Sequence, residues 1–181
     1  CLALGEAVGD SGLRHLLGQT ARQGMERYAA VNGKRLEDIT DFSDLPTPQT
    51  TADWFSMGWW LHVELGRYEE AEAAYLHAIE LDPKFANAWH GLGYLVLYYL
   101  EKSEDAEKAY QTILGLKPDD LAATSNLLAL HLMQPEKQAE AEAEFEAVVS
   151  RHPPHGAGLL RAIRALVHNN FGEATEALKP V

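Results

Sequence analysis

The sequence has one cysteine, no long apolar run and few basic side chains. Cys1 is alone, so an intrachain disulfide is excluded. No stretch approaches about 18 consecutive apolar residues, so no membrane-spanning helix is predicted. Lysine and arginine number 15 against 27 acidic residues, which gives a net charge of −12. This balance argues against nucleic acid as a partner, because binding a phosphate backbone requires clustered basic side chains.

Motifs for catalysis and metal binding are also missing. The eight histidines are scattered, and the chain has no HExxH, CxxC, phosphate-binding loop or nucleophile elbow. His152 and His155 flank two prolines, a pattern more typical of a turn than of a metal site. We therefore predict no enzymatic activity, no cofactor and no metal.

What the sequence does contain is a repeat of 35 residues. Trp54 and Trp89 open two copies, and Pro83 and Pro118 close them at the same spacing. Each copy has two apolar stripes at helical spacing, so each is expected to form two helices joined by a short turn. First helices are predicted near 52–65, 86–101, 120–133 and 156–169. Second helices are predicted near 67–81, 103–116, 136–151 and 171–178.

Two segments are predicted along the chain. Residues 1–50 should hold one amphipathic helix near 11–32, followed by a linker at 34–50 in which Pro46 and Pro48 enforce an extended backbone. Residues 51–181 should form the repeat array, divided into 51–85, 86–120, 121–155 and a partial copy at 156–181. The array carries most of the negative charge, with 18 acidic against 7 basic side chains between residues 51 and 155. This charge is expected on a solvated face.

The pattern Trp-x2-Leu-Gly, then Ala-x3-aromatic, then Pro resembles the tetratricopeptide repeat. The residues that carry the resemblance are Trp54, Met57, Gly58, Ala71, Tyr75, Ala78 and Pro83 in the first copy, Trp89, Leu92, Gly93, Ala106, Tyr110 and Pro118 in the second, and Leu127, Ala141, Phe145 and Pro153 in the third. The third copy departs from the pattern at Thr124 and Leu128. The resemblance implies an all-α fold, a right-handed α-solenoid of antiparallel helix pairs with an N-terminal amphipathic helix.

The repeat period points to a local difference from the family. A tetratricopeptide repeat usually has 34 residues, so one further residue is expected in each unit here. We place it at the turns near Leu65-Gly66 and Glu101-Lys102.

The resemblance also implies a scaffold that binds a protein or peptide partner. In such arrays the first helices line a concave groove, and the side chains outside the repeat signature predict its binding surface. These predicted groove residues are Phe55, Trp59, His62, Asn87, His90, Tyr94, Leu97, Tyr98, Ala129, Leu132, Met133, Arg161 and Arg164. Many are aromatic or apolar, which favours a peptide with apolar anchors over recognition of a terminal carboxylate.

Other occupants and other roles remain open at this point. The helix at 11–32 or the linker at 46–49 could cover the groove, and so could a second copy of the chain in a homodimer. The chain could also be a regulatory or sensor segment of a larger signalling or enzyme chain, or a small dedicated chaperone for a secreted or assembled partner.

A cytoplasmic location is predicted. If Cys1 is the lipid-bearing residue of a bacterial lipoprotein, a lipid-anchored periplasmic location replaces it, although a fragment boundary is the favoured explanation of Cys1.

Overall fold

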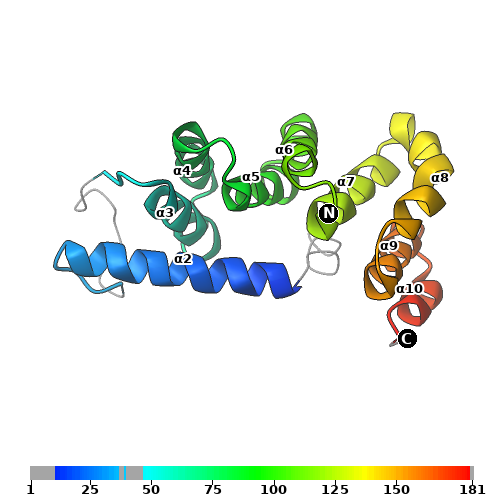
Figure 1. The fold of residues 1–181 in the computed structure, drawn as a ribbon, viewed down its shortest axis with the longest axis horizontal. Coiled ribbons are helices and arrows are strands. Elements are labelled where there is room, and N and C mark those ends of the chain that lie inside the picture. Colours follow the sequence, from blue (N-terminus) through cyan, green and yellow to red (C-terminus); the bar gives the residue numbers. More distant parts are fainter. Residues whose placement is uncertain (1–10, 37–38, 40–46, 180–181) are drawn as a thin grey trace. The chain divides into compact units, whose positions relative to one another are not determined.

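The computed structural model describes residues 11–36, 39 and 47–179, and within them the regular secondary structure is helical. Figure 1 shows the helices in chain order. Their bounds are α2 (Ser11–Val31), α3 (Thr51–Val63), α4 (Tyr68–Leu81), α5 (Ala86–Tyr98), α6 (Ser103–Leu116), α7 (Leu121–Met133), α8 (Pro135–Ser150), α9 (Pro154–Val167) and α10 (Phe171–Ala177). The predicted fold class, an α-solenoid of helix pairs preceded by an N-terminal helix, is confirmed.

The described chain forms two compact units, residues 11–102 and residues 103–179. In the first unit α2 packs on α3, α3 on α4, and α4 on α5. In the second unit α7 packs on α6, α8 and α9, and α9 packs on α10. Members of a pair are joined by short turns and therefore run antiparallel. The division of the sequence into segments 1–50 and 51–181 stays a prediction.

Capping side chains mark where two of the first helices, α3 and α7, begin. Thr50 precedes α3, and its hydroxyl oxygen accepts a hydrogen bond from the backbone N–H of Asp53 at 3.1 Å. Asp120 precedes α7, and its carboxylate accepts one from the N–H of Ala123 at 2.9 Å. Both side chains satisfy backbone donors that the first helical turn leaves unpaired.

The turns inside the first two repeats have the same backbone conformation, 35 residues apart. Gly66 has a φ of 64° and Glu101 a φ of 56°. The following N–H groups reach back six residues, from Arg67 to the carbonyl of Leu61 at 2.9 Å and from Lys102 to that of Val96 at 2.8 Å. This left-handed cap ends a helix by satisfying its last carbonyls. It lies where the sequence predicts the additional residue of the 35-residue period.

The core of the first unit is built around Tyr75 of α4, which is fully buried. A Cβ atom on Gly58 would come within 2.8 Å of the tyrosine ring, and a Cβ atom on Gly91 within 2.7 Å. Glycine in the middle of a helix costs about 1 kcal/mol relative to alanine. Here the missing side chains of α3 and α5 leave room for the ring, which offsets that cost.

The core of the second unit combines a mainly aliphatic cluster around α8 with the fully buried ring of Tyr110 in α6. Phe145 of α8, which has the same register as Tyr75, is fully buried in a cluster with leucine, isoleucine, valine and alanine side chains. The other buried members of this cluster are Leu128, Ala129, Leu132, Ala141, Val149, Ala157, Leu160 and Ile163. A smaller cluster joins α9 and α10 through Ala162, Ala165 and Ala174.

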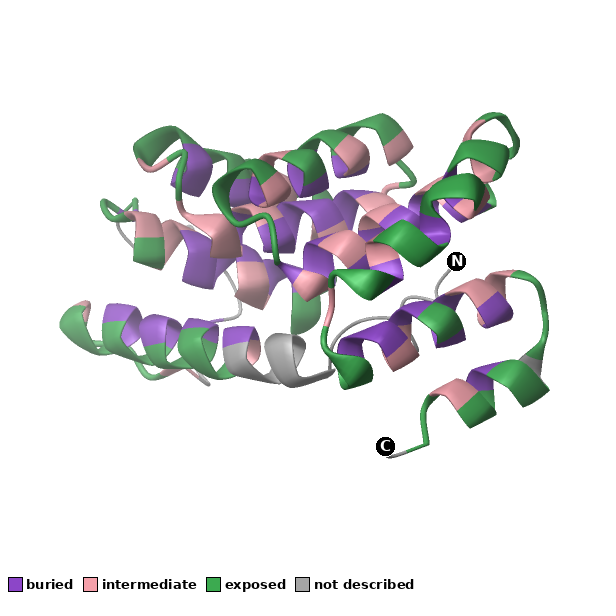
Figure 2. Cartoon of the chain, turned by 45° about the vertical axis from the view of Figure 1, so that its right-hand side comes forward, coloured by how far each residue is buried: buried purple, intermediate pink, exposed green. Residues whose placement is uncertain are grey.

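Helix α2 lies against α3 with one buried face, as the burial colours in Figure 2 show. Leu17, Ala21, Met25, Tyr28 and Ala29 are buried and lie on one face of the helix, as the predicted amphipathic stripe requires. The linker that follows is described at 34–36, 39 and 47–50 only, and Ile39 is buried. Pro46, where an extended backbone is predicted, lies outside the described residues.

Candidate binding surface

Two of the predicted groove residues on α3 are buried side chains. Phe55 is 1 % exposed, and its ring meets that of Phe85 edge-on with 5.6 Å between centroids. It also lies 6.1 Å from the ring of Tyr75. Phe55 therefore packs within the first unit and is closed to a ligand in this conformation.

His62 is also buried, with 5 % of its surface exposed, and sits among aromatic rings. Its ring lies 4.8 Å from Tyr99, 5.9 Å from Tyr94 and 6.1 Å from Tyr68 between centroids. Neither ring nitrogen has a hydrogen-bond partner among the described residues. Burial disfavours the charged imidazolium and lowers the pKa of His62 to about 4.

Trp59 is half-buried, and helix α2 passes close to it. A Cβ atom on Gly18 would come within 3.2 Å of the indole, and one on Gly24 within 2.0 Å of the Ser56 hydroxyl oxygen. Gly18 and Gly24 thus allow α2 to approach α3 closely. The N-terminal helix covers this part of the predicted groove surface, which is one of the occupants left open by the sequence.

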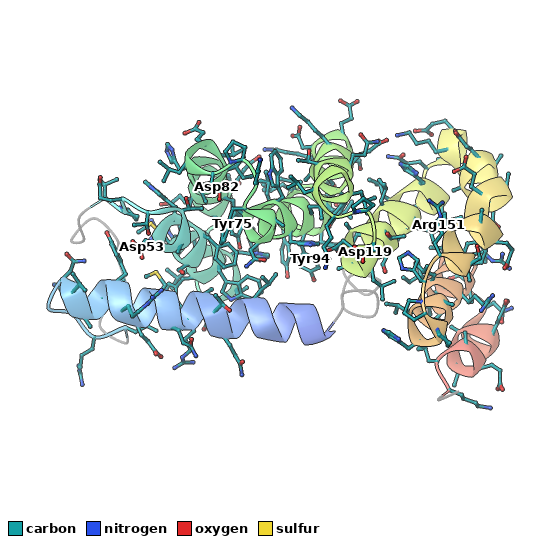
Figure 3. The ribbon with its side chains drawn as sticks, in the orientation of Figure 1. Asp53, Tyr75, Asp82, Tyr94, Asp119 and Arg151 are labelled. Atoms are coloured by element: carbon teal, nitrogen blue, oxygen red, sulfur yellow. The ribbon has the colours of Figure 1, made fainter. Side chains whose placement is uncertain are left out.

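Helix α5 presents a mixture of buried and half-buried residues. His90 and Tyr98 are buried, whereas Asn87, Tyr94 and Leu97 are half-buried. The ring of Tyr94 lies 4.7 Å from that of Tyr98. Tyr94 (labelled in Figure 3) is therefore held by ring contacts while part of it stays accessible.

In the second unit the predicted residues also divide. Ala129 and Leu132 are buried in the aliphatic cluster, whereas Met133 is 41 % exposed at the end of α7. The guanidinium of Arg164 lies 4.2 Å from the centroid of the Phe145 ring and 3.8 Å from a carboxylate oxygen of Glu142. Arg161 is exposed and lies 3.5 Å from Glu146. Both arginines are engaged within their own unit.

The structure also contains a pocket that the sequence analysis missed. It has a volume of about 520 Å³ and is lined by residues of α6, α7 and α8 in the second unit. Thr124 and Leu128 of α7, the two positions where the third copy departs from the repeat pattern, both contribute to it. The departure at Thr124 could have predicted the pocket, because replacing tryptophan by threonine removes a large side chain.

Two other features bear on function. None of the described helices is long and apolar enough to cross a membrane. Among the described residues no group of three or more histidine, cysteine, aspartate or glutamate side chains is placed to hold a metal ion.

These consecutive helix pairs, with a glycine-flanked aromatic side chain packed between helices, define an α-helical repeat protein. One family model, described as TPR repeat, matches residues 61–97, and another, described as tetratricopeptide repeat, matches residues 95–156. Together they cover more than half of the chain, so the protein belongs to the tetratricopeptide repeat family. Repeats of this family are generally modules of protein–protein interaction and typically non-enzymatic. No curated protein matches the chain.

Proposed function

We propose that the protein is an interaction scaffold that binds a segment of a partner polypeptide, and that it is not an enzyme. The observation that supports this proposal is the half-buried face of α5, where Asn87, Tyr94 and Leu97 present a polar group beside apolar surface. An amide at this place can pair with a peptide backbone, and the ring and the leucine can contact apolar side chains.

The proposed surface is smaller than the predicted groove. Phe55 and His62 are buried, and Trp59 lies beneath α2. A partner that used Trp59 would have to displace α2 from α3. We therefore place first contact in the N-terminal unit at α5, and keep Met133, Arg161 and Arg164 as the accessible candidates of the other unit.

The test is partner capture with the full chain and a matched pair of double variants. Tyr94→Ala/Leu97→Ala removes the apolar part of the α5 surface, and is expected to lose partners that the wild type retains. Leu76→Ala/Leu81→Ala removes two exposed leucines from α4 and should retain them. Circular dichroism establishes that both variants are folded.

Equal capture by the wild type and both variants would contradict the α5 surface. Light scattering on the same samples separates a foreign partner from a second copy of this chain. If the wild type is a dimer that Tyr94→Ala/Leu97→Ala converts to a monomer, the occupant of the surface is the chain itself.

A further inference from the structure

The pocket of the second unit has the size and lining of a binding site. Its volume of about 520 Å³ falls within the range of about 300–1,000 Å³ typical of ligand pockets. Leu114, Leu127, Leu128, Ala141 and Val148 supply apolar walls. Exposed polar side chains lie beside them, among them Asp119 and Arg151, which Figure 3 labels.

The position of Thr124 in the repeat is occupied by tryptophan in the first two copies. Thr124 stands 35 residues after Trp89 and 70 after Trp54. In the first unit the ring of Trp54 lies 4.6 Å from that of His77, on the second helix of its own pair. The corresponding helix in the third copy is α8, which lines the pocket.

A hydrogen bond strengthens this correspondence. The indole N–H of Trp89 donates to the backbone carbonyl oxygen of Pro83 at 2.9 Å. Pro118 has the register of Pro83, and it lines the pocket together with Thr124. The third copy therefore keeps the proline whose counterpart accepts from the Trp89 indole, and it lacks the indole.

Thr124 does not replace the missing ring. Its hydroxyl donates to the carbonyl oxygen of Asp120 at 2.9 Å, one turn earlier in α7, and so stays on its own helix. An apolar cavity formed by loss of a large side chain can bind a small apolar molecule of the missing shape. This pocket includes the position at which the third repeat has threonine in place of tryptophan.

We propose that this pocket binds an indole-sized aromatic side chain presented by a partner polypeptide. The register supplies the shape, and Pro118 stands 35 residues after Pro83, whose carbonyl accepts from the indole N–H of Trp89. A peptide source is favoured because the rim carries Asp119, Glu144 and Arg151, which can pair with peptide N–H and carbonyl groups. The proposal rests on the proposed function, since it names one kind of anchor that the scaffold takes.

The test titrates three probes into the full chain and follows binding by calorimetry. N-acetyl-tryptophanamide carries the ring and two peptide groups, 5-fluoroindole carries the ring alone, and N-acetyl-leucinamide carries the peptide groups without a ring. The wild type is expected to bind N-acetyl-tryptophanamide at least about tenfold more tightly than N-acetyl-leucinamide. It should bind N-acetyl-tryptophanamide more tightly than 5-fluoroindole, because only the former reaches the polar rim.

Thr124→Trp supplies the ring within the chain and should exclude the probes. We expect binding of N-acetyl-tryptophanamide to weaken at least about tenfold. The Tm should rise by about 2–4 °C, because the new side chain fills a cavity. Thr124→Ser keeps the pocket open and should bind as the wild type does. If Thr124→Trp is unfolded by circular dichroism, Thr124→Leu takes its place as the filling variant.

Several results would overturn the proposal. These are absent binding of N-acetyl-tryptophanamide, equal binding by the filling variant, or equal affinity for N-acetyl-leucinamide. Tighter binding of 5-fluoroindole would overturn the peptide source. The probes require no partner, and Tyr94→Ala/Leu97→Ala should bind them like the wild type. The experiment therefore distinguishes a failure of the pocket proposal from a failure of the proposed α5 binding surface.

Discussion

The two units of the chain use the same repeat with different side chains between the helices. All four tryptophans and six of the seven tyrosines precede residue 103, in the unit of residues 11–102. There, rings pack on rings, as around His62, and Tyr75 occupies the space left by two glycines. The unit of residues 103–179 packs Phe145 among aliphatic side chains and has an open pocket at Thr124.

The comparison shows that the repeat pattern fixes helix pairs without fixing how the space between them is filled. Large planar side chains fill that space in the first unit and bury an imidazole with them. Both units also have an ion pair at the same repeat position, between Glu72 and Lys102 in the first and between Glu107 and Lys137 in the second. The first unit therefore depends more on ring packing, and the second leaves room for a ligand.

The largest expected effect is that of removing the central ring of the first unit. Tyr75→Ala should lower the free energy of unfolding by about 3–5 kcal/mol, because a fully buried aromatic side chain leaves a cavity. Gly58 and Gly91 have no side chains that could relax into that cavity. Urea denaturation followed by circular dichroism measures the change.

The matched variant in the second unit is Phe145→Ala, at the same register. Phe145 is equally buried, but Leu128, Leu132 and Leu160 surround it and can shift toward the vacated space. We therefore expect Phe145→Ala to cost less than Tyr75→Ala. An equal or larger cost would contradict the packing difference between the two units.

The next effect is a pH dependence that arises at His62, in the unit of residues 11–102. Because burial lowers the pKa of His62 from 6.5 to about 4, the folded state binds a proton there less readily than the unfolded state. The resulting stability is fully present above pH 6.5 and is lost as the pH falls toward 4. The shift corresponds to about 3 kcal/mol.

His62→Phe keeps a ring among Trp59, Tyr68, Tyr75, Tyr94 and Tyr99 and removes the titrating group. Tyrosine side chains are neutral over this pH range. The difference in unfolding free energy between pH 7 and pH 4 should therefore shrink by about 3 kcal/mol in the variant. His155→Gln, at an exposed position of α9, is the control and should leave the wild-type difference unchanged.

The smallest effect concerns the ion pairs of the second unit. A hydrogen bond from Lys137 lowers the pKa of Glu107, burial opposes this, and a further bond from His131 at 3.2 Å adds to the lowering. The lowered pKa means that this stability is present above pH 4.5 and is lost as the pH falls. Because Glu107 and Lys137 are partly exposed, solvent screens the pair, and Glu107→Gln should cost about 0.5–1 kcal/mol.

Urea denaturation of wild type and Glu107→Gln at low and high salt measures this cost. It should fall in 1 M salt, where the screening length is about 3 Å. Glu140→Gln, an exposed position on α8, should cost nothing measurable at either salt concentration. A cost for Glu107→Gln that is independent of salt would exclude an electrostatic origin.

Much of the fold could be predicted from the sequence because its determinants are local. The 35-residue spacing of Trp54 and Trp89 and of Pro83 and Pro118 predicted the helix pairs. The longer period predicted the position of an additional turn residue, and Gly66 and Glu101 have left-handed backbone there. Helix periodicity and turn chemistry act over a few residues, so a single sequence records them.

The candidate site was harder to predict because it depends on which elements cover one another. Helical periodicity predicted that Phe55, Trp59 and His62 lie on one side of α3. It could not show that Phe55 and His62 are buried or that α2 lies over Trp59. The predicted groove residues remain a proposal. The pocket at Thr124 was recorded in the sequence only as a departure from the pattern.

By itself the sequence determined the helices, their pairing, the family and the residue types available for binding. Only the tertiary structure decided which of those residues are accessible and where space remains unfilled. The physical reason is that the faces of a helix follow from its own sequence, whereas burial depends on the side chains brought by neighbouring helices. Tyr75 and Thr124 illustrate this. Tyr75 fills a space left by glycines of two other helices. Thr124 lines a pocket at the position where the earlier repeats have tryptophan.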